Sequence, residues 1–448
     1  MKAISNYGML GVLLLLSLLF SILTLRPQHP TGEAAARAIA PRLDPSGPIL
    51  IVARADEEDT RFTRALAARL GGARTVGIIA GEPSDIRAQF ERFAPPAGVT
   101  IATPESYEPT VRAVLASFPA LAGVPLVTPP SYRWPTFLLR DNLRNVANQI
   151  AVIALVAIGM TMVIITGGID LSVGSLIALA AVAATGVIGH VGAENATAGG
   201  MLAGGLVAIL LCAAFGAFSG LTITRFNVPP FIATLAVMQV ASGIAYILSK
   251  GRPIYRVPDA FVALGRGADP VVGIPYAVLL MAGLFVIAHL VMSRTVLGRY
   301  IYAVGGNSEA ARLAGVRVNG VLMFAYIASA ALAGLGGVVM ASQLKSGAPT
   351  YGVTYELYVI AAVVVGGTSL SGGEGRILGT LIGAFIIAVI QNGMNLTNVE
   401  SYTQKVVLGL VILSAVLLDR LKHQGQGWIR RRGGANDPPP GRSAGGSP

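Results

Sequence analysis

One acidic residue stands between two long apolar segments of this chain. Asp170 lies in the stretch GGIDLSVG, which begins at Gly167. An ionisable side chain between membrane segments is costly unless it faces a cavity or a partner, so Asp170 is a candidate functional residue. The flanking glycines permit a broken or re-entrant backbone, whose free amides must line water or protein. Alternatively, Asp170 caps the next helix by accepting hydrogen bonds from its first amides, and both roles are compatible.

A second glycine-rich stretch, GGTSLSGG, begins 199 residues later at Gly366. Each stretch follows an apolar segment that contains Val-Ile-Ala and precedes another apolar segment. Glycine-interrupted segments at corresponding places in two halves indicate a transport path, although chance matching of glycine-rich turns is an alternative. Hydroxyl and carboxylate groups on such a path are suited to hydrogen bonding with a hydroxylated solute. The candidate path residues are Gly167, Gly168, Asp170, Ser172, Gly366, Gly367, Thr368 and Ser369.

Two other patterns do not indicate an enzyme. The letters LSGGE from Leu370 resemble the signature peptide of ATP-binding-cassette ATPases, but the sequence contains no G-x-x-x-x-G-K-[ST] loop to hold phosphates. We therefore expect no ATP hydrolysis by this chain itself. The histidines are scattered without a second ligand at metal spacing, so we expect no metal site. They are His29, His190, His289 and His423.

The connection 293–318 contains a short helical pattern between apolar segments. Asn307 or Ser308 is suited to cap a helix that runs through Leu313 and ends near Gly315. A short helix outside the membrane either docks a partner or lies on the membrane surface, and the residues alone leave both alternatives open.

The composition assigns these segments to a membrane protein. Apolar residues make up 53% of the 448 residues and charged residues only 12%, whereas soluble proteins carry roughly 25% charged residues. The net charge of +11 does not indicate nucleic-acid binding, because the basic excess lies in short loops and in the C-terminal tail. We therefore predict an all-α polytopic membrane protein that contacts lipid and no nucleic acid. Cys212 lies in an apolar run and is expected to be a small buried residue.

About ten membrane helices are predicted, in two pseudo-repeated halves. The first, from Gly8 to Leu25, is either an anchor or a cleaved signal peptide, and the lack of a small-x-small site directly after it favours the anchor. The others lie near residues 145–166, 172–190, 199–223, 229–249, 272–292, 319–341, 355–368, 377–393 and 403–419.

The charge distribution predicts the orientation of these helices. An even number of helices places both termini on one side, and the basic tail assigns that side to the cytoplasm. The tail, rich in Gly, Pro and Ser, is expected to be disordered. The loop 250–271 disagrees, because its basic residues would lie outside; either a helix is miscounted or this loop contacts something external. Those residues are Lys250, Arg252, Arg256 and Arg266.

The region between the first two helices has the pattern of a small α/β domain. Residues 26–136 hold 12 Arg and 11 acidic residues, and short β-rich runs alternate there with helical stretches. The predicted β-α-β-α-β-α-β order consists of Pro48–Ala53, Asp59–Leu70, Thr75–Ala80, Ser84–Phe93, Val99–Ala102, Glu108–Phe118 and Val124–Thr128. The acidic run Asp56–Asp59 is expected to be a solvated helix start and not a metal site. The predicted domains are a first helix (1–25), an extracytoplasmic insertion (26–136), a permease core (137–421) and a cytoplasmic tail (422–448).

Four long motifs occur in a fixed order along the second part of the chain. They are GMTMVIITGGIDLSVGSLIAL, NVPPFIATLAVM from Asn227, GRYIYAVGGNSEAARLAGV from Gly298 and VIAAVVVGGTSLSGGEGRILGTLIGA. With these motifs, the chain from about Asn142 to Leu421 resembles the ribose-type family of ABC sugar-importer permeases.

The resemblance implies a translocation unit in the bacterial inner membrane, built from this chain and a second permease copy or a homologous permease. A sugar-binding protein would feed it from outside, and an ABC ATPase would drive it from the cytoplasm, with ATP bound on that partner and no cofactor in this chain. The connection 293–318 would then be the coupling segment that seats in the ATPase. The candidate coupling residues are Arg299, Gly306, Asn307, Glu309, Ala310, Ala311, Arg312 and Gly315.

Two departures from the family pattern stand out. The chain has Glu356-Leu357-Tyr358 where the family usually has Glu-Leu-Asp, and it carries the insertion where the family has a short link. Within the insertion, ILIVARADEEDTRFTRALAARLGG and GVPLVTPPSY resemble part of one lobe of a periplasmic sugar-binding protein. Because the insertion supplies less than one lobe, we expect either a docking platform for a separate binding protein, or a spacer or relic.

The expected function is import of a monosaccharide by alternating access, driven by a separate ATPase. One alternative is an ion-coupled secondary transporter in which Asp170 carries a proton or sodium ion, which would leave the coupling-type loop without a role. Another is a membrane receptor with the insertion as its sensor.

Overall fold

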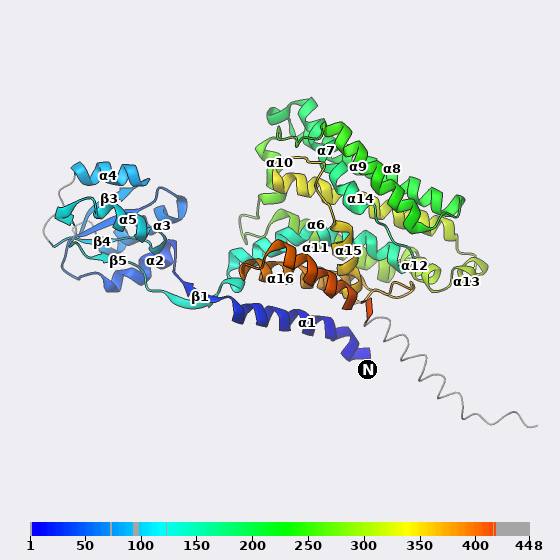
Figure 1. Ribbon diagram of the computed structural model, residues 1–448, viewed down its shortest axis with the longest axis horizontal. Coiled ribbons are helices and arrows are strands. Elements are labelled where there is room, and N and C mark those ends of the chain that lie inside the picture. The colour runs from blue at the N-terminus through cyan, green and yellow to red at the C-terminus, as the bar shows by residue number, and fades with distance from the viewer. Residues whose placement is uncertain (1, 72–73, 93–97, 122, 415, 418–448) are drawn as a thin grey trace, which may run out of the picture. The chain divides into compact units, whose positions relative to one another are not determined.

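The computed structural model describes residues 2–71, 74–92, 98–121, 123–414 and 416–417. The chain forms two compact units (Figure 1). One consists of Thr24–Thr136, and the other combines the segment before Thr24 with the chain from Phe137 onward. The predicted tail 422–448 lies outside the described residues.

A four-stranded parallel sheet forms the centre of the unit Thr24–Thr136. Its strand order is β3-β2-β4-β5, with β2 paired to both β3 and β4. The strands are β2 (Ile49–Ala53), β3 (Thr75–Ala80), β4 (Thr100–Ala102) and β5 (Leu126–Val127), and the connecting helices are α3 (Glu57–Leu70), α4 (Pro83–Arg92) and α5 (Glu108–Leu115). This arrangement confirms the predicted alternation of strands and helices.

Strand β2 is buried along its whole length because helices cover both faces of the sheet. Successive side chains of a strand point to opposite faces. Ile49 and Ile51 accordingly join a cluster with Phe62 of α3, whereas Leu50 and Val52 join one with Phe90 of α4. The continuous apolar run ILIVA is the pattern expected for a parallel strand covered on both sides.

Several features of this unit were not predicted. A helix, α2 (Gly32–Ile39), packs against α3, and β1 (Leu25–Gln28) pairs antiparallel with β6 (Tyr132–Pro135). The expectation of a solvated acidic helix start is wrong for Asp59, which is buried and accepts a hydrogen bond from the amide of Arg54 (3.0 Å). Burial raises the pKa of the Asp59 carboxyl above its usual value.

Helices make up the second unit. Seven helices of the described chain are long and apolar enough to cross a membrane: α6 (Arg140–Ile165), α7 (Val173–Val191), α8 (Ala198–Arg225), α9 (Pro230–Ser249), α11 (Tyr276–Arg294), α14 (Val318–Leu344) and α16 (Ile377–Leu396). Three shorter apolar helices occupy the remaining predicted positions: Gly8–Leu23 within α1 (Lys2–Leu23), α15 (Tyr355–Val365) and Ser401–Ser414. Short 3₁₀ turns occur at Ala40–Arg42, Glu105–Tyr107, Pro119–Leu121, Thr136–Leu138 and Ala193–Asn195.

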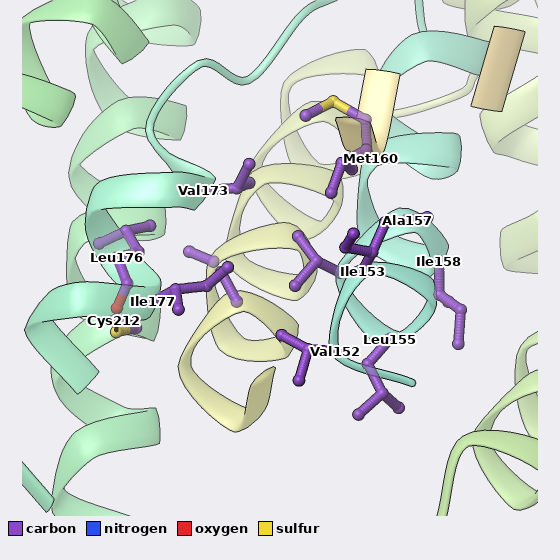
Figure 2. Packing of buried hydrophobic residues seen from close by; sticks show 14 of the residues in the cluster. Val152, Ile153, Leu155, Ala157, Ile158, Met160, Val173, Leu176, Ile177 and Cys212 are labelled. Carbon is purple, nitrogen blue, oxygen red and sulfur yellow. Dashed lines mark hydrogen bonds between the residues drawn. The ribbon is translucent and has the colours of Figure 1, made fainter. Parts of the chain in front are cut away.

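Helix α14 lies at the centre of this unit, packed against α6, α7 and α8. Figure 2 shows Val152 of α6 and Ile177 of α7 on either side of the α14 ribbon, with Cys212 beside α7. Small residues allow such close packing, as at Gly337 of α14, whose backbone lies against the Ile177 carbonyl. Cys212 is buried, as predicted.

The helices differ in how much of their surface this unit covers. Of the most apolar window of α6, 89% is buried within the chain, but only 22% of that of α8 and 28% of those of α9 and α11. A helix that is apolar all round must be covered by protein or by lipid. Helices α8, α9 and α11 therefore present their apolar outer sides to lipid or to another membrane subunit.

The loop 250–271 contains no additional spanning helix in the described chain. It forms α10 (Asp259–Arg266), which is too short to cross a bilayer. One of the four basic residues of this loop acts within the unit, because Arg266 Nε donates to the Gln343 carbonyl (2.5 Å). Helix α10 also pairs through Asp259 with Lys345, at the end of α14 (2.5 Å). The hydrogen bond from Lys345 lowers the pKa of Asp259.

Candidate functional site: two glycine turns and the coupling segment

The first glycine stretch ends α6 with a tight backbone turn. The amide of Gly167 donates to the Ile164 carbonyl (2.9 Å), and that of Gly168 donates to the Val163 carbonyl (3.1 Å). This pair of bonds is the Schellman pattern, which satisfies the last carbonyls of a helix and places one residue in the left-handed region. Gly167 occupies that place with φ +84°, which explains why a glycine is required there.

The second glycine stretch ends α15 in the same way. Gly367 also has φ +84°, its amide donates to Val364 (2.8 Å), and the amide of Thr368 donates to Val363 (3.2 Å). The backbone thus matches Gly167 with Gly367, which is 200 residues later, and not with Gly366. The sequence comparison had paired Gly167 with Gly366, an offset of 199 residues. That offset was wrong by one residue, because it was based on amino-acid identity and not on backbone conformation.

The Asp170 carboxylate ties the first turn to the central helix. Its Oδ1 accepts hydrogen bonds from the Ser172 amide (3.0 Å) and hydroxyl (2.6 Å), and its Oδ2 accepts one from the Ser329 hydroxyl of α14 (2.8 Å). The side chain is only 2% exposed. Ser172 lies directly before the first residue of α7, so Asp170 binds the amide at the start of this helix and not those inside it. Through Ser329, Asp170 also connects this turn to α14.

The other predicted path residues are packed inside the unit. Ser172, Thr368 and Ser369 are buried, and the amide of Ser369 donates to the Glu374 carbonyl (3.0 Å), which holds the loop after the second turn. Among the described residues, the Thr368 hydroxyl has no hydrogen-bond partner. A role of these residues in a solute path stays a prediction.

The predicted helix in the connection 293–318 is confirmed, and a second helix precedes it. Helix α13 (Ser308–Leu313) begins with Asn307, whose side chain accepts a hydrogen bond from the Ala310 amide (3.0 Å). Gly315 follows it with φ +85°. The preceding helix α12 (Val296–Gly306), which contains Arg299, was not predicted. We call α12 and α13 together the coupling segment.

The coupling segment contacts both glycine turns through backbone atoms. The amide of Gly373 donates to the Ile165 carbonyl at the end of α6 (2.8 Å), and Gly305 of α12 lies against both groups. A Cβ atom at position 305 would overlap the Ile165 carbonyl. The Tyr302 hydroxyl of α12 also donates to the Gly375 carbonyl (2.8 Å). A displacement of α12 therefore acts directly on the end of α6 and on the loop that leads from the second glycine turn to α16.

The sequence analysis missed several of these residues, and only some of them could have been recognised from the sequence. Gly305 was not predicted, because its contacts with Ile165 and Gly373 are seen only in the folded structure. Leu313, at the end of α13, is 90% exposed and carries a signal that could have been used. A large apolar side chain on a short helix outside the membrane indicates contact with a partner. Within α13, Ala311 is buried against the unit, and Arg312 pairs with Glu309 on the surface (3.3 Å).

A cavity of about 230 Å³ opens where these elements meet. Its walls come from the first glycine turn, the end of α8, the start of α9, the coupling segment and the start of α14. Of the predicted path residues, Gly167 and Gly168 line it, and of the predicted coupling residues, Arg312 does.

Comparison with known proteins identifies the family. Residues 142–416 match the family described as branched-chain amino acid transport system / permease component. The chain belongs to this permease family. The match begins after the unit Thr24–Thr136 ends.

Three relatives illustrate the similarity of this permease to curated proteins. It is 44% identical over 293 residues to the ribose import permease protein RbsC of Escherichia coli K12, covering 64% of this chain and 88% of the relative. It is 43% identical over 297 residues to RbsC of Bacillus subtilis 168, covering 64% and 87%. It is 37% identical over 290 residues to the L-arabinose transport system permease protein AraH of Escherichia coli K12, covering 65% and 86%. No solved structure matches the chain significantly.

Proposed function

We propose that this chain is the permease subunit of an ABC importer for a monosaccharide, with a pentose as the first candidate. The observation that carries the proposal is the 44% identity to a ribose import permease over nearly all of that relative. The family description names branched-chain amino acids, but the relatives cited above are named for ribose and arabinose. Both are neutral, hydroxylated solutes of similar size, so a pentose agrees best with both relatives.

The proposed mechanism is alternating access driven through the coupling segment. ATP binding and hydrolysis on a separate ATPase would displace α13, with exposed Leu313 and Arg312 at the contact. Helix α12 would pass this displacement to the end of α6 and to the loop before α16, because Gly305 and Tyr302 contact them directly. From α6, the bond between Asp170 and Ser329 would carry it to α14.

The proposed assembly lies in the inner membrane and contains more than this chain. An ABC ATPase would bind the coupling segment from the cytoplasm, where both termini would also lie. A sugar-binding protein would deliver solute from outside, with the unit Thr24–Thr136 as its docking platform. A second permease copy, or a homologous permease, would pack against the outward apolar faces of the helices. The two permeases together would form the complete path.

The arrangement around Asp170 does not favour an ion-coupled secondary transporter. An ion-carrying carboxylate must exchange with water or with the ion during each cycle. Both oxygens of Asp170 are engaged by Ser172 and Ser329, and the residue does not line the cavity. Membership of a permease-component family supports a separate partner for the coupling segment, and the ion-coupled alternative has no role for this segment.

The proposal is tested by uptake of labelled D-ribose, L-arabinose and D-glucose into cells with and without this chain, co-expressed with its ATPase and binding protein. Each assay is repeated after ATP depletion and, separately, with a protonophore under conditions that preserve ATP. We expect pentose uptake that requires ATP and survives the protonophore. Uptake that survives ATP depletion and collapses with the ion gradient would contradict the ABC mechanism.

A further inference from the structure

The cavity beside the coupling segment contains a buried hydroxyl group without a protein partner. Tyr326 of α14 is only 1% exposed and lines the cavity, and its hydroxyl makes no hydrogen bond to the described residues. That hydroxyl lies against Gly168, where a Cβ atom would overlap it. A buried phenol normally finds a hydrogen-bond partner, because leaving it unpaired costs free energy. The group is therefore available to a bound molecule.

The other polar groups around the cavity are one cation and several neutral side chains that both donate and accept hydrogen bonds. The side chains of Asn227, Asn319, Thr224 and Ser308 line it together with the guanidinium of Arg312. No aspartate or glutamate occurs among the described residues that line it. Because the one charged side chain is an arginine and carboxylates are absent from this lining, the cavity favours a negatively charged ligand over a cation.

Two long helices begin at this cavity. Pro230 is the first residue of α9, and Val318 and Asn319 open α14; all three line the cavity. Neither helix start has a side-chain cap. The N-terminus of a helix carries a partial positive charge that favours anions.

The negative groups near the cavity are already engaged. Glu309 pairs with Arg312 on the surface, where an ion pair is weak and leaves the guanidinium available to a second partner. Asp170 is held by Ser172 and Ser329 and does not line the cavity. The cavity of about 230 Å³ is far larger than one water needs, which leaves room for a small molecule.

We propose that this cavity is a binding site for an organic phosphate, with Arg312 and the starts of α9 and α14 facing the phosphate and the Tyr326 hydroxyl donating a hydrogen bond to it. The phosphate comes either from a soluble sugar phosphate or from the headgroup of an anionic lipid. Because α12, α13 and α14 all contribute to the walls, an occupied site holds the coupling segment against the first glycine turn. The choice of a pentose phosphate as probe rests on the proposed function. The preference of the site for an anion does not depend on that function.

The test measures binding to the full-length chain alone, without ATPase or binding protein. Wild-type protein in phosphatidylcholine nanodiscs is dialysed against labelled D-ribose 5-phosphate, with D-ribose and inorganic phosphate as competitors. The variants are Tyr326→Phe and Arg312→Gln. Their matched controls are Tyr351→Phe, a tyrosine that bonds Ser346, and Arg252→Gln, an exposed arginine that does not line the cavity.

We expect inorganic phosphate, and not D-ribose, to displace the probe. Tyr326→Phe should weaken binding about threefold to tenfold, the effect of one lost hydrogen bond. Arg312→Gln should weaken it about tenfold or more, because a charge-assisted bond is lost. Both controls should bind like the wild type. Without ligand, Tyr326→Phe should unfold at the wild-type temperature or above, since the hydroxyl has no protein partner; this shows that its binding defect is not misfolding.

A second arm distinguishes the two sources of phosphate. Nanodiscs that contain phosphatidylglycerol weaken probe binding if the lipid headgroup occupies the cavity, and leave it unchanged if the site takes soluble phosphate; either result supports the anion site. The proposal is overturned if D-ribose competes as well as inorganic phosphate, if both cavity variants bind like the wild type, or if the probe does not bind. None of these results bears on the import assay, which tests the proposed function separately.

Discussion

Removing the Ser329 hydroxyl should weaken the connection between the first glycine turn and the central helix. In the change Ser329→Ala, the Asp170 carboxylate loses the donor at 2.8 Å and keeps the two hydrogen bonds from Ser172. Hydrogen bonds between membrane helices average about 0.6 kcal/mol in double-mutant cycles and reach about 1.7 kcal/mol. Because both residues are almost fully buried, we expect a value near the upper end, about 1.5 kcal/mol.

The assay is a double-mutant cycle of the free energy of unfolding in mixed micelles. It combines Ser329→Ala with Asp170→Asn. The interaction energy is the difference between the effect of the double change and the sum of the effects of the two single changes. Ser219→Ala is the matched control, because this buried serine hydroxyl has no hydrogen-bond partner among the described residues, and it should change stability by less than about 0.5 kcal/mol. An interaction energy below about 0.5 kcal/mol would refute the assignment of this bond as the mechanical link.

Three further predictions concern the coupling segment and the unit Thr24–Thr136. Gly305→Ala should lower ATP-driven uptake about tenfold or more without preventing membrane insertion, because a Cβ atom meets backbone there, whereas Gly243→Ala, with open space around its Cβ, should transport normally. Leu313→Asp should abolish stimulation of the partner ATPase while leaving thermal stability unchanged, as the side chain is 90% exposed; unchanged stimulation would exclude Leu313 from the contact. The pKa of Asp59 is raised by burial, so its ionised form costs stability above that pKa and the cost disappears as pH falls through it. Asp59→Asn should therefore slow hydrogen exchange of β2 at pH 7, with a difference from the wild type that shrinks toward pH 4; a pH-independent difference would contradict this account.

Local chemistry was enough to predict the features that depend on neighbouring residues. The run ILIVA identified a strand covered on both faces, and the Asn307 cap identified a six-residue helix, because both depend on residues close in the sequence. The membrane helices were predicted for the same reason, because a long apolar run is also a property of neighbouring residues. Helix α12 was missed because its apolar residues and two terminal glycines resemble a loop beside longer apolar runs.

The partners of the site residues could not be predicted from the sequence. Ser329 bonds Asp170 from 159 positions away, and neither its type nor its neighbours distinguish it from other serines in apolar helices. The contact of Gly305 with Ile165 likewise joins two segments that only the packing around α14 brings together. The pairing of Gly167 with Gly367 needed backbone angles, since the letters alone suggested the wrong register.

The antiparallel pairing of β1 with β6 places the entry and the exit of the unit Thr24–Thr136 side by side, about 5 Å apart. The unit therefore connects the segment before it to the segment after it as a short hairpin loop would, whatever its number of residues. Lengthening a loop whose ends are fixed costs only about 0.6 kcal/mol for each doubling of its length. A gene that encodes such a permease can accordingly gain or lose the whole module at this one point, without changing the order, direction or packing of its membrane helices.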